Sequence, residues 1–210
     1  MSTRPAKTPA AGAPVPAVED LPAGQRARRA RIIAAALDLL ADADYERIQI
    51  RMVAERAGVA LGTLYRYFPS KEHLFAAALA EWGSGFGPRQ SGRADTRPAD
   101  PEARLKRALR DAVTAFERNP QLFSLVNLLS SVDDPDVAET YWRYAEQTRA
   151  AFMGVLDGVD PDVAETIVWM SLALLTSVLQ SWVTGRVTID EARRRLDKGV
   201  DVIFTVPPTT

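Results

Sequence analysis

The amino-acid sequence predicts an all-α protein with a small N-terminal domain of three helices and a larger helical domain after it. Apolar residues recur at helical spacing along most of the chain, and no segment alternates with the period of two that is typical of a β-strand. The 210 residues are 47% hydrophobic, which is enough for a sizeable core. We expect three units, covering residues 1–23, 24–70 and 71–206.

The first unit is rich in Pro, Ala and Gly and is expected to be a disordered arm, because it cannot bury enough apolar surface to offset the entropy of ordering. The small domain then begins with an amphipathic helix, predicted from Gln25 to Ala41. A second helix is predicted over residues 50–57. Gly58 follows it and suits the left-handed conformation that closes many helices.

A third, two-turn helix is predicted over residues 61–67, because Pro69 cannot continue the hydrogen-bond ladder. Ser70 is a suitable N-cap for a fourth helix that reaches Trp82. A segment rich in Gly, Pro and Ser, at about residues 83–100, is expected to be a flexible connection. Helical patterns then cover residues 101–118, 121–131, 136–156, 163–183 and 189–204.

The composition excludes several classes of chemistry. The chain has no cysteine, which excludes disulfides, thiolate metal sites and cysteine nucleophiles. His73 is the only histidine, and without a second nitrogen ligand it is expected to be an exposed helix residue, so no metal site is predicted. No pair of carboxylates, Ser/His arrangement or phosphate-cradling glycine loop stands out. The sequence therefore predicts a chain that is not an enzyme and needs no cofactor.

The charge is distributed unevenly. The net charge is −1, but residues 25–75 carry nine cations against six acids, so the N-terminal third is mildly basic and the remainder is acidic. The most apolar segment, residues 167–178, is interrupted by polar residues and is shorter than the ~20 residues that cross a bilayer. We therefore expect a cytoplasmic protein with no membrane partner, associated with the nucleoid if the basic third binds DNA.

The stretch GVALGTLYRYFPSK, residues 58–71, has the composition of a recognition helix. Two short helices joined by a tight glycine-containing turn indicate a helix-turn-helix, whose second helix enters the DNA major groove. Leu64 and Phe68 share a face and are expected to anchor this helix to its scaffold. The polar residues are then expected to point outward: Thr63, Tyr65, Arg66 and Tyr67.

Residues 26–82 resemble the DNA-binding domain of the TetR family of repressors, with the densest match over MVAERAGVALGTLYRYFPSKEHLF. The resemblance implies base-reading positions at Arg51, Leu61, Gly62, Thr63 and Tyr65. It implies phosphate contacts from Arg66, Tyr67 and Lys71, and Gln49 is a further phosphate candidate. Many members have His in place of Tyr67 and Thr in place of Gln49, so the chain departs from the family pattern at these two positions.

The resemblance also implies that the larger domain binds a small molecule between its helices. Apolar residues on several helices are the candidates for lining the pocket, with Asn127 as a polar contact, and ordinary core packing is the alternative for each of them. The candidates are Phe116, Leu122, Phe123, Val126, Asn127, Trp142, Phe152 and Trp169.

In this family the last two helices pair with a second subunit, which implies a homodimer. The helix predicted over residues 163–183 is apolar nearly all round and therefore needs covering on two sides, although a single-chain core is the alternative. The interface candidates are Leu172, Leu175, Leu179, Trp182, Leu196, Val200, Ile203 and Phe204, with Trp169 as a further one.

The segments QIRMVA, RNP and SWVTGR are similar to the KstR-type subgroup, regulators of sterol and lipid catabolism. This similarity implies a large apolar effector, such as a steroid or a fatty acyl-CoA thioester. The expected function is a homodimeric repressor that binds double-stranded DNA at a palindromic operator and is released by that effector. The alternatives are a regulator of efflux or another pathway with a different ligand, and a ligand-independent DNA-binding protein.

Overall fold

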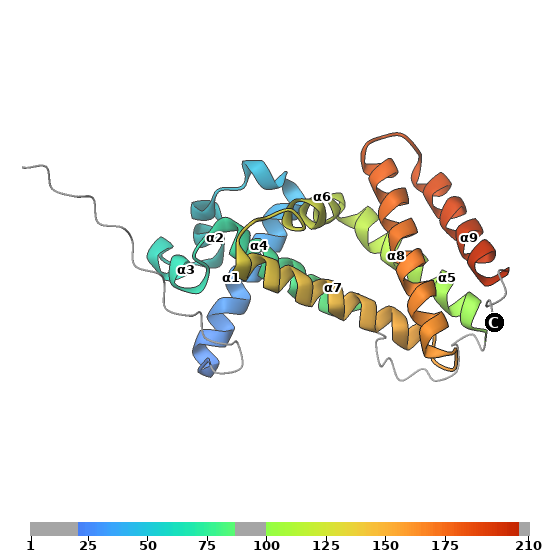
Figure 1. Cartoon of the computed structure of the whole chain (residues 1–210). Coiled ribbons are helices and arrows are strands. Elements are labelled where there is room, and N and C mark those ends of the chain that lie inside the picture. Colours follow the sequence, from blue (N-terminus) through green and yellow to red (C-terminus); the bar gives the residue numbers. More distant parts are fainter. Residues whose placement is uncertain (1–20, 87–99, 206–210) are drawn as a thin grey trace, which may run out of the picture.

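The computed structural model describes residues 21–86 and 100–205, and within these ranges every regular element is a helix (Figure 1). The predicted all-α fold class is therefore confirmed for the described residues. Most of the expected disordered arm, most of the expected flexible connection and the last five residues lie outside the described ranges.

The N-terminal helices form where they are predicted. α1 covers Ala23–Asp42, α2 covers Ile50–Ala57 and α3 covers Leu61–Tyr67. Gly58 ends α2 with φ 64°, a left-handed conformation that residues with a Cβ rarely adopt. A short 3₁₀ helix at Tyr45–Arg47, which the sequence pattern does not predict, joins α1 to α2.

α4, covering Lys71–Gly83, is the centre of the molecule. It packs against α1 on one side and against α6 and α7 on the others, and six consecutive residues from Leu74 to Leu79 are buried. At its C-terminal end Gly83 leaves no room for a side chain, because a Cβ there would lie 2.4 Å from the ring of Tyr144. α4 therefore connects the N-terminal helices, α1 to α3, to the rest of the chain through tightly packed contacts.

The larger domain continues with five helices: α5 (Pro101–Arg118), α6 (Pro120–Leu129), α7 (Pro135–Val155), α8 (Pro161–Val183) and α9 (Ile189–Thr205). All but α9 begin with proline, which suits the first helical position because its missing N–H would be unpaired there. α8 and α9 lie side by side at the opposite end of the molecule from α2 and α3 (Figure 1).

The first turns of α7 and α8 are built from the same heptapeptide, DPDVAET, at residues 134–140 and 160–166. In each copy the first aspartate caps the helix. Asp134 Oδ1 accepts hydrogen bonds from the backbone N–H groups of Asp136 (3.0 Å) and Val137 (3.2 Å). The Asp160 carboxylate accepts the equivalent pair at 3.1 and 3.3 Å. The two helices thus start with the same geometry in different surroundings.

α8 is long and apolar enough to cross a membrane by length and composition alone, but 39% of its most apolar window is buried inside the fold. It contacts α5, α6, α7 and α9. Core helices of soluble proteins pass the same length and composition test, so this feature gives only weak support to a membrane span.

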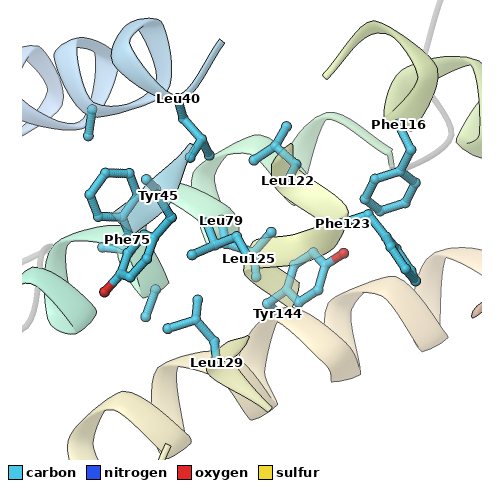
Figure 2. Close-up of a cluster of buried hydrophobic side chains, with 14 of the residues drawn as sticks. Leu40, Tyr45, Phe75, Leu79, Phe116, Leu122, Phe123, Leu125, Leu129 and Tyr144 are labelled. Atoms are coloured by element: carbon cyan, nitrogen blue, oxygen red, sulfur yellow. The ribbon is translucent and has the colours of Figure 1, made fainter. Parts of the chain in front are cut away.

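The core runs from the N-terminal helices into the larger domain without a break. Figure 2 shows side chains from α1, α4, α6 and α7 meeting in one cluster. Phe75 of α4 contacts the ring of Tyr45 edge-on, with ring centroids 5.1 Å apart. The other labelled members are Leu40, Leu79, Phe116, Leu122, Phe123, Leu125, Leu129 and Tyr144. A displacement of α6 or α7 would therefore be transmitted to α4 and α1 through direct packing.

Candidate nucleic-acid interface and effector region

α3 presents one face to solvent and one to the protein. Leu64 and Phe68 are buried, as expected for the residues that anchor this helix. Tyr65 is 47% exposed and Leu61 is an exposed apolar residue at the first position of the helix. Gly62 and Arg66 are also exposed and Thr63 is half-buried, so the open face of α3 carries small, aromatic and cationic groups together.

The start of α2 lies at the surface too. Gln49 and Arg51 are exposed, and Arg51 has no ion-pair partner within residues 21–86 and 100–205. No side chain caps α2, so its first-turn N–H groups can still donate hydrogen bonds to an anionic partner. An unpaired cation beside free backbone donors suits contact with DNA.

Tyr67 does not point outward as predicted. Its side chain is 7% exposed, and its hydroxyl is buried with no hydrogen-bond partner in the described part of the chain. The reason is helical geometry, because Leu64, Tyr67 and Phe68 are spaced by three and four residues and so share the buried face of a two-turn helix. In this conformation Tyr67 packs α3 onto its scaffold.

Lys71, predicted to contact a phosphate, is tied inward. Its ammonium group donates a hydrogen bond to the backbone carbonyl of Tyr45 and lies 3.8 Å from the centroid of that ring. Burial lowers the pKa of Lys71. The hydroxyls of Tyr45 (3.2 Å) and Ser70 (2.7 Å) both donate to Glu72. Lys71 and Glu72 therefore fix the start of α4 against the loop between α1 and α2.

Sequence reasoning missed the role of Arg29. Its guanidinium lies 5.2 Å from the centre of the Phe68 ring, so α1 and the end of α3 are joined by a cation–π contact. These residues are far apart in sequence, and nothing in the local pattern of either segment predicts the contact. Arg29 holds the recognition helix in place from behind.

The predicted effector residues separate into a buried group and an exposed group. Phe116 packs against Phe123 at 5.7 Å and against Trp82 of α4 at 5.0 Å between ring centroids. Leu122 and Phe152 are also buried, Val126 and Asn127 are half-buried, and Asn127 donates a hydrogen bond to Gln180 at 2.8 Å. With Phe123 included, these six residues come from α5, α6 and α7.

Trp142 and Trp169 are not placed to line an internal pocket. Their side chains are 65% and 72% exposed, respectively, because each lies on the outer side of its helix. Both residues were predicted to line a pocket because they are apolar, but their positions around the helix axis place both rings at the surface of the single chain. An exposed tryptophan on α8 instead fits a surface that another molecule covers.

A cavity of about 220 Å³ opens between α1, α4 and the start of α6. It shares only Leu122 with the predicted pocket; the other lining residues are Leu37, Asp38, Leu40, Ala41, Trp82 and Asn119. Beside it, Gln121 of α6 donates a hydrogen bond of 2.6 Å to Asp44. The cavity therefore lies where α4 and α6 of the larger domain meet α1.

The predicted interface residues also separate by burial. Leu175, Leu179, Leu196 and Val200 lie in the core of their own chain and cannot present their side chains to a partner in this conformation. Each sits on the side of α8 or α9 that faces the protein. The partly exposed candidates are Leu172, Trp182, Ile203 and Phe204. Four further apolar residues of α8 and α9 are exposed: Trp169, Met170, Val183 and Val202.

His73 is not the exposed helix residue that was expected. Its side chain is 15% exposed, and its Nε2 lies 3.7 Å from Asp134 Oδ1 at the start of α7. This contact joins the first turn of α4 to the start of α7, and the sequence gives no sign of it because 61 positions separate the two residues.

A short exposed helix, anchored from behind and following a glycine turn, defines a helix-turn-helix DNA-binding protein with an attached helical domain. Residues 32–78 match the family "Bacterial regulatory proteins, tetR family", and residues 99–203 match "Tetracyclin repressor-like, C-terminal domain". The chain belongs to the TetR family of bacterial transcriptional regulators.

Individual relatives agree with this assignment. The chain is 32% identical over 192 residues to the HTH-type transcriptional repressor KstR of Rhodococcus jostii, covering 86% of this chain and 84% of that protein. A TetR transcriptional regulator from Rhodococcus sp. RHA1 has a similar structure, with a TM-score of 0.73, 28% identity, and coverage of 87% and 98%. The regulator FadR of Bacillus subtilis, solved in complex with stearoyl-CoA, shares the fold with a TM-score of 0.63, 18% identity, and coverage of 84% and 97%.

Proposed function

We propose that this protein is a homodimeric transcriptional repressor that binds a palindromic operator and is released by a large apolar effector. The observation that carries the proposal is the exposed face of α3, which is anchored through Leu64 and Phe68 and presents Leu61, Tyr65 and Arg66 to solvent. Residues 24–70 act as the DNA-binding domain and residues 71–206 bind the effector and the second subunit. Such a protein works in the cytoplasm, on chromosomal DNA.

In this proposal Arg51, Leu61, Gly62, Thr63 and Tyr65 read base edges, while Arg66 and Gln49 contact phosphates. Two α3 helices lie in successive major grooves, about one helical turn apart. Tyr67 and Lys71 have positioning roles, because the structure holds both side chains against the protein.

The effector binds among Phe116, Leu122, Phe123 and Phe152, which are buried apolar side chains from α5, α6 and α7. The identity to a KstR repressor and the fold shared with an acyl-CoA-bound regulator support a lipid-like effector, a steroid or a fatty acyl-CoA. Entry of such a ligand requires the ring contacts of Phe116 with Trp82 and Phe123 to open.

Opening those contacts would move the α3 helices of the two subunits. Trp82 lies on α4, and α4 also carries Phe75 in the packing beneath the DNA-binding domain. A ligand that pushes Trp82 therefore tilts α4 and changes the distance between the two α3 helices of a dimer. The coupling free energy is the difference between the free energies of ligand binding to the two arrangements of the dimer, one with α4 tilted and one without.

Replacing Arg51 with alanine is expected to weaken operator binding more than binding to random duplex DNA, by about 1–3 kcal/mol for the operator, because a base contact is lost. Arg66→Ala is expected to weaken both similarly and to lower the salt slope by about 1, as loss of a phosphate contact does. Gel retardation of both duplexes over a range of salt concentrations measures these effects.

Arg186→Ala is the matched control, because Arg186 is an exposed arginine beyond the end of α8, far from α3 in sequence. It removes the same charge and should leave both affinities within about a factor of two. Equal losses on operator and random duplex for Arg51→Ala would remove Arg51 from the base-reading residues.

Stearoyl-CoA or a steroid is expected to release the operator complex at micromolar concentration, whereas coenzyme A alone should not, because it lacks the apolar chain. Titration of a fluorescent operator complex with each compound measures the release. Release by none of them, together with intact operator binding, would favour the ligand-independent alternative or a regulator of another pathway.

A further inference from the structure

We propose that His73, Asp134 and Asp136 form a binding site for a divalent transition-metal ion between the first turns of α4 and α7. Each residue offers one ligand atom, and these three atoms lie within 4.8 Å of one another. His73 Nε2 and Asp134 Oδ1 are 3.7 Å apart, which is close to the separation of two ligands on one tetrahedral ion with bonds of about 2.0–2.2 Å.

The hydrogen bonds of Ser70 determine which tautomer the neutral His73 imidazole adopts. The Ser70 hydroxyl donates its single proton to Glu72 at 2.7 Å, so towards His73 Nδ1, 3.0 Å away, it can only accept. Neutral His73 then carries its proton on Nδ1, and the lone pair of Nε2 faces Asp134. A ligating imidazole in a metal site is commonly held in this way through its second nitrogen.

The carboxylates complete the set of acceptors. Asp134 Oδ1 is held by two backbone N–H groups at the start of α7, and the carboxylate of Asp136 has no hydrogen-bond or ion-pair partner among residues 21–86 and 100–205. The Nε2 lone pair of His73 therefore faces two carboxylates, and no side-chain donor from the described residues is bound to either carboxylate at this point. A cation in this position would satisfy all three groups.

The ligand types indicate which ions suit the site. One imidazole nitrogen with two carboxylate oxygens fits Mn²⁺, Co²⁺, Ni²⁺ or Zn²⁺, whereas Mg²⁺ and Ca²⁺ prefer oxygen ligands alone. Water would fill the remaining positions, because Asp134 and Asp136 are partly or fully exposed.

A bound ion would fasten two parts of the molecule. His73 is the third residue of α4 and follows the recognition helix by six positions, while Asp134 and Asp136 belong to the start of α7 in the larger domain. The metal would hold the start of α4, which directly follows the recognition helix, against the start of α7. Metal binding itself does not depend on the proposed repressor function, so the two can fail separately.

The repeated heptapeptide provides the matched control. Asp160 and Asp162 at the start of α8 reproduce the capping geometry of Asp134 and Asp136, but no histidine belongs to a metal-type cluster with them in the described part of the chain. Asp162→Asn therefore makes the same chemical change as Asp136→Asn in the same local geometry without touching the site.

Isothermal titration of the chelator-treated full-length protein with ZnCl₂, repeated with CoCl₂, tests the proposal. We expect about one ion per chain and, with Co²⁺, visible absorption bands from the nitrogen and oxygen ligands. His73→Gln and Asp136→Asn should each weaken binding at least about tenfold, and Asp162→Asn should leave it unchanged. Circular dichroism confirms that the variants are folded, and Asp136 is exposed, so its replacement should not disturb the fold.

Three results would overturn the proposal: no binding below about 1 mM ion, undiminished affinity in both site variants, or an equal loss in Asp162→Asn. The first would leave His73 and Asp134 as a hydrogen-bonded or ion-paired contact, and the others would place the ion elsewhere.

Discussion

Replacing Phe75 with alanine is expected to lower the free energy of unfolding by about 3–5 kcal/mol, a large part of the total stability of a typical domain. Phe75 is fully buried, and its ring packs edge-on against Tyr45 in the cluster that joins α4 to the DNA-binding region (Figure 2). Alanine would leave a cavity that the surrounding helices can fill only in part. Thermal or urea unfolding measures the loss, and the melting temperature should fall by about 10 °C.

Two further variants separate packing from other causes. Phe75→Leu keeps most of the volume and should cost less than about 1.5 kcal/mol. Trp142→Ala removes a larger ring from the surface of α7 and should change stability by less than about 0.5 kcal/mol. A loss below about 1 kcal/mol for Phe75→Ala would show that α4 is not packed as described.

The helix-turn-helix could be predicted closely because its signals are local. Gly58 provides the left-handed conformation that ends α2, and Pro69 stops α3, so the observed bounds of both helices coincide with the predicted ones. In the larger domain, proline after an aspartate or asparagine begins four helices. The start at Pro101 was predicted at the proline itself, and the other three helices begin one or two residues before the predicted starts.

Side-chain directions were harder to predict, because they depend on what each helix packs against. Tyr67 looks like a surface residue by composition, but its position three residues after Leu64 buries it. Leu175 and Leu179 look like interface residues because α8 is apolar all round, yet they face the core of their own chain. Their spacing from other buried residues on the same helix would have indicated that Tyr67, Leu175 and Leu179 are buried.

Contacts between distant segments left no trace in the sequence pattern. Lys71 meets Tyr45, Arg29 meets Phe68 and His73 meets Asp134 only after the helices have packed. Each of these pairs lies around α4 or the end of α3. The sequence therefore predicts the recognition helix well, but not the contacts that hold it against the rest of the protein.

Replacing Trp169 with glutamate is expected to convert the proposed homodimer into a monomer and to weaken operator binding at least about 100-fold. Trp169 is 72% exposed beside Met170 on α8, so the single chain gains little from burying it, whereas a dimer through α8 and α9 would cover it. A carboxylate there would be buried without a partner. A monomer also binds one half-site alone and loses the gain of about 10²–10⁴ that linked binding provides.

Sedimentation and operator titration test this expectation together, with Trp142→Glu as the matched control. Trp142 is similarly exposed at 65% but lies on α7, outside the proposed interface, so this variant should remain dimeric and bind the operator normally. Because neither ring belongs to the core, both substitutions should leave the stability of the folded single subunit close to that of the native chain. A dimeric Trp169→Glu variant with native operator affinity would place the interface away from this face of α8, and a monomeric Trp142→Glu variant would move it to α7.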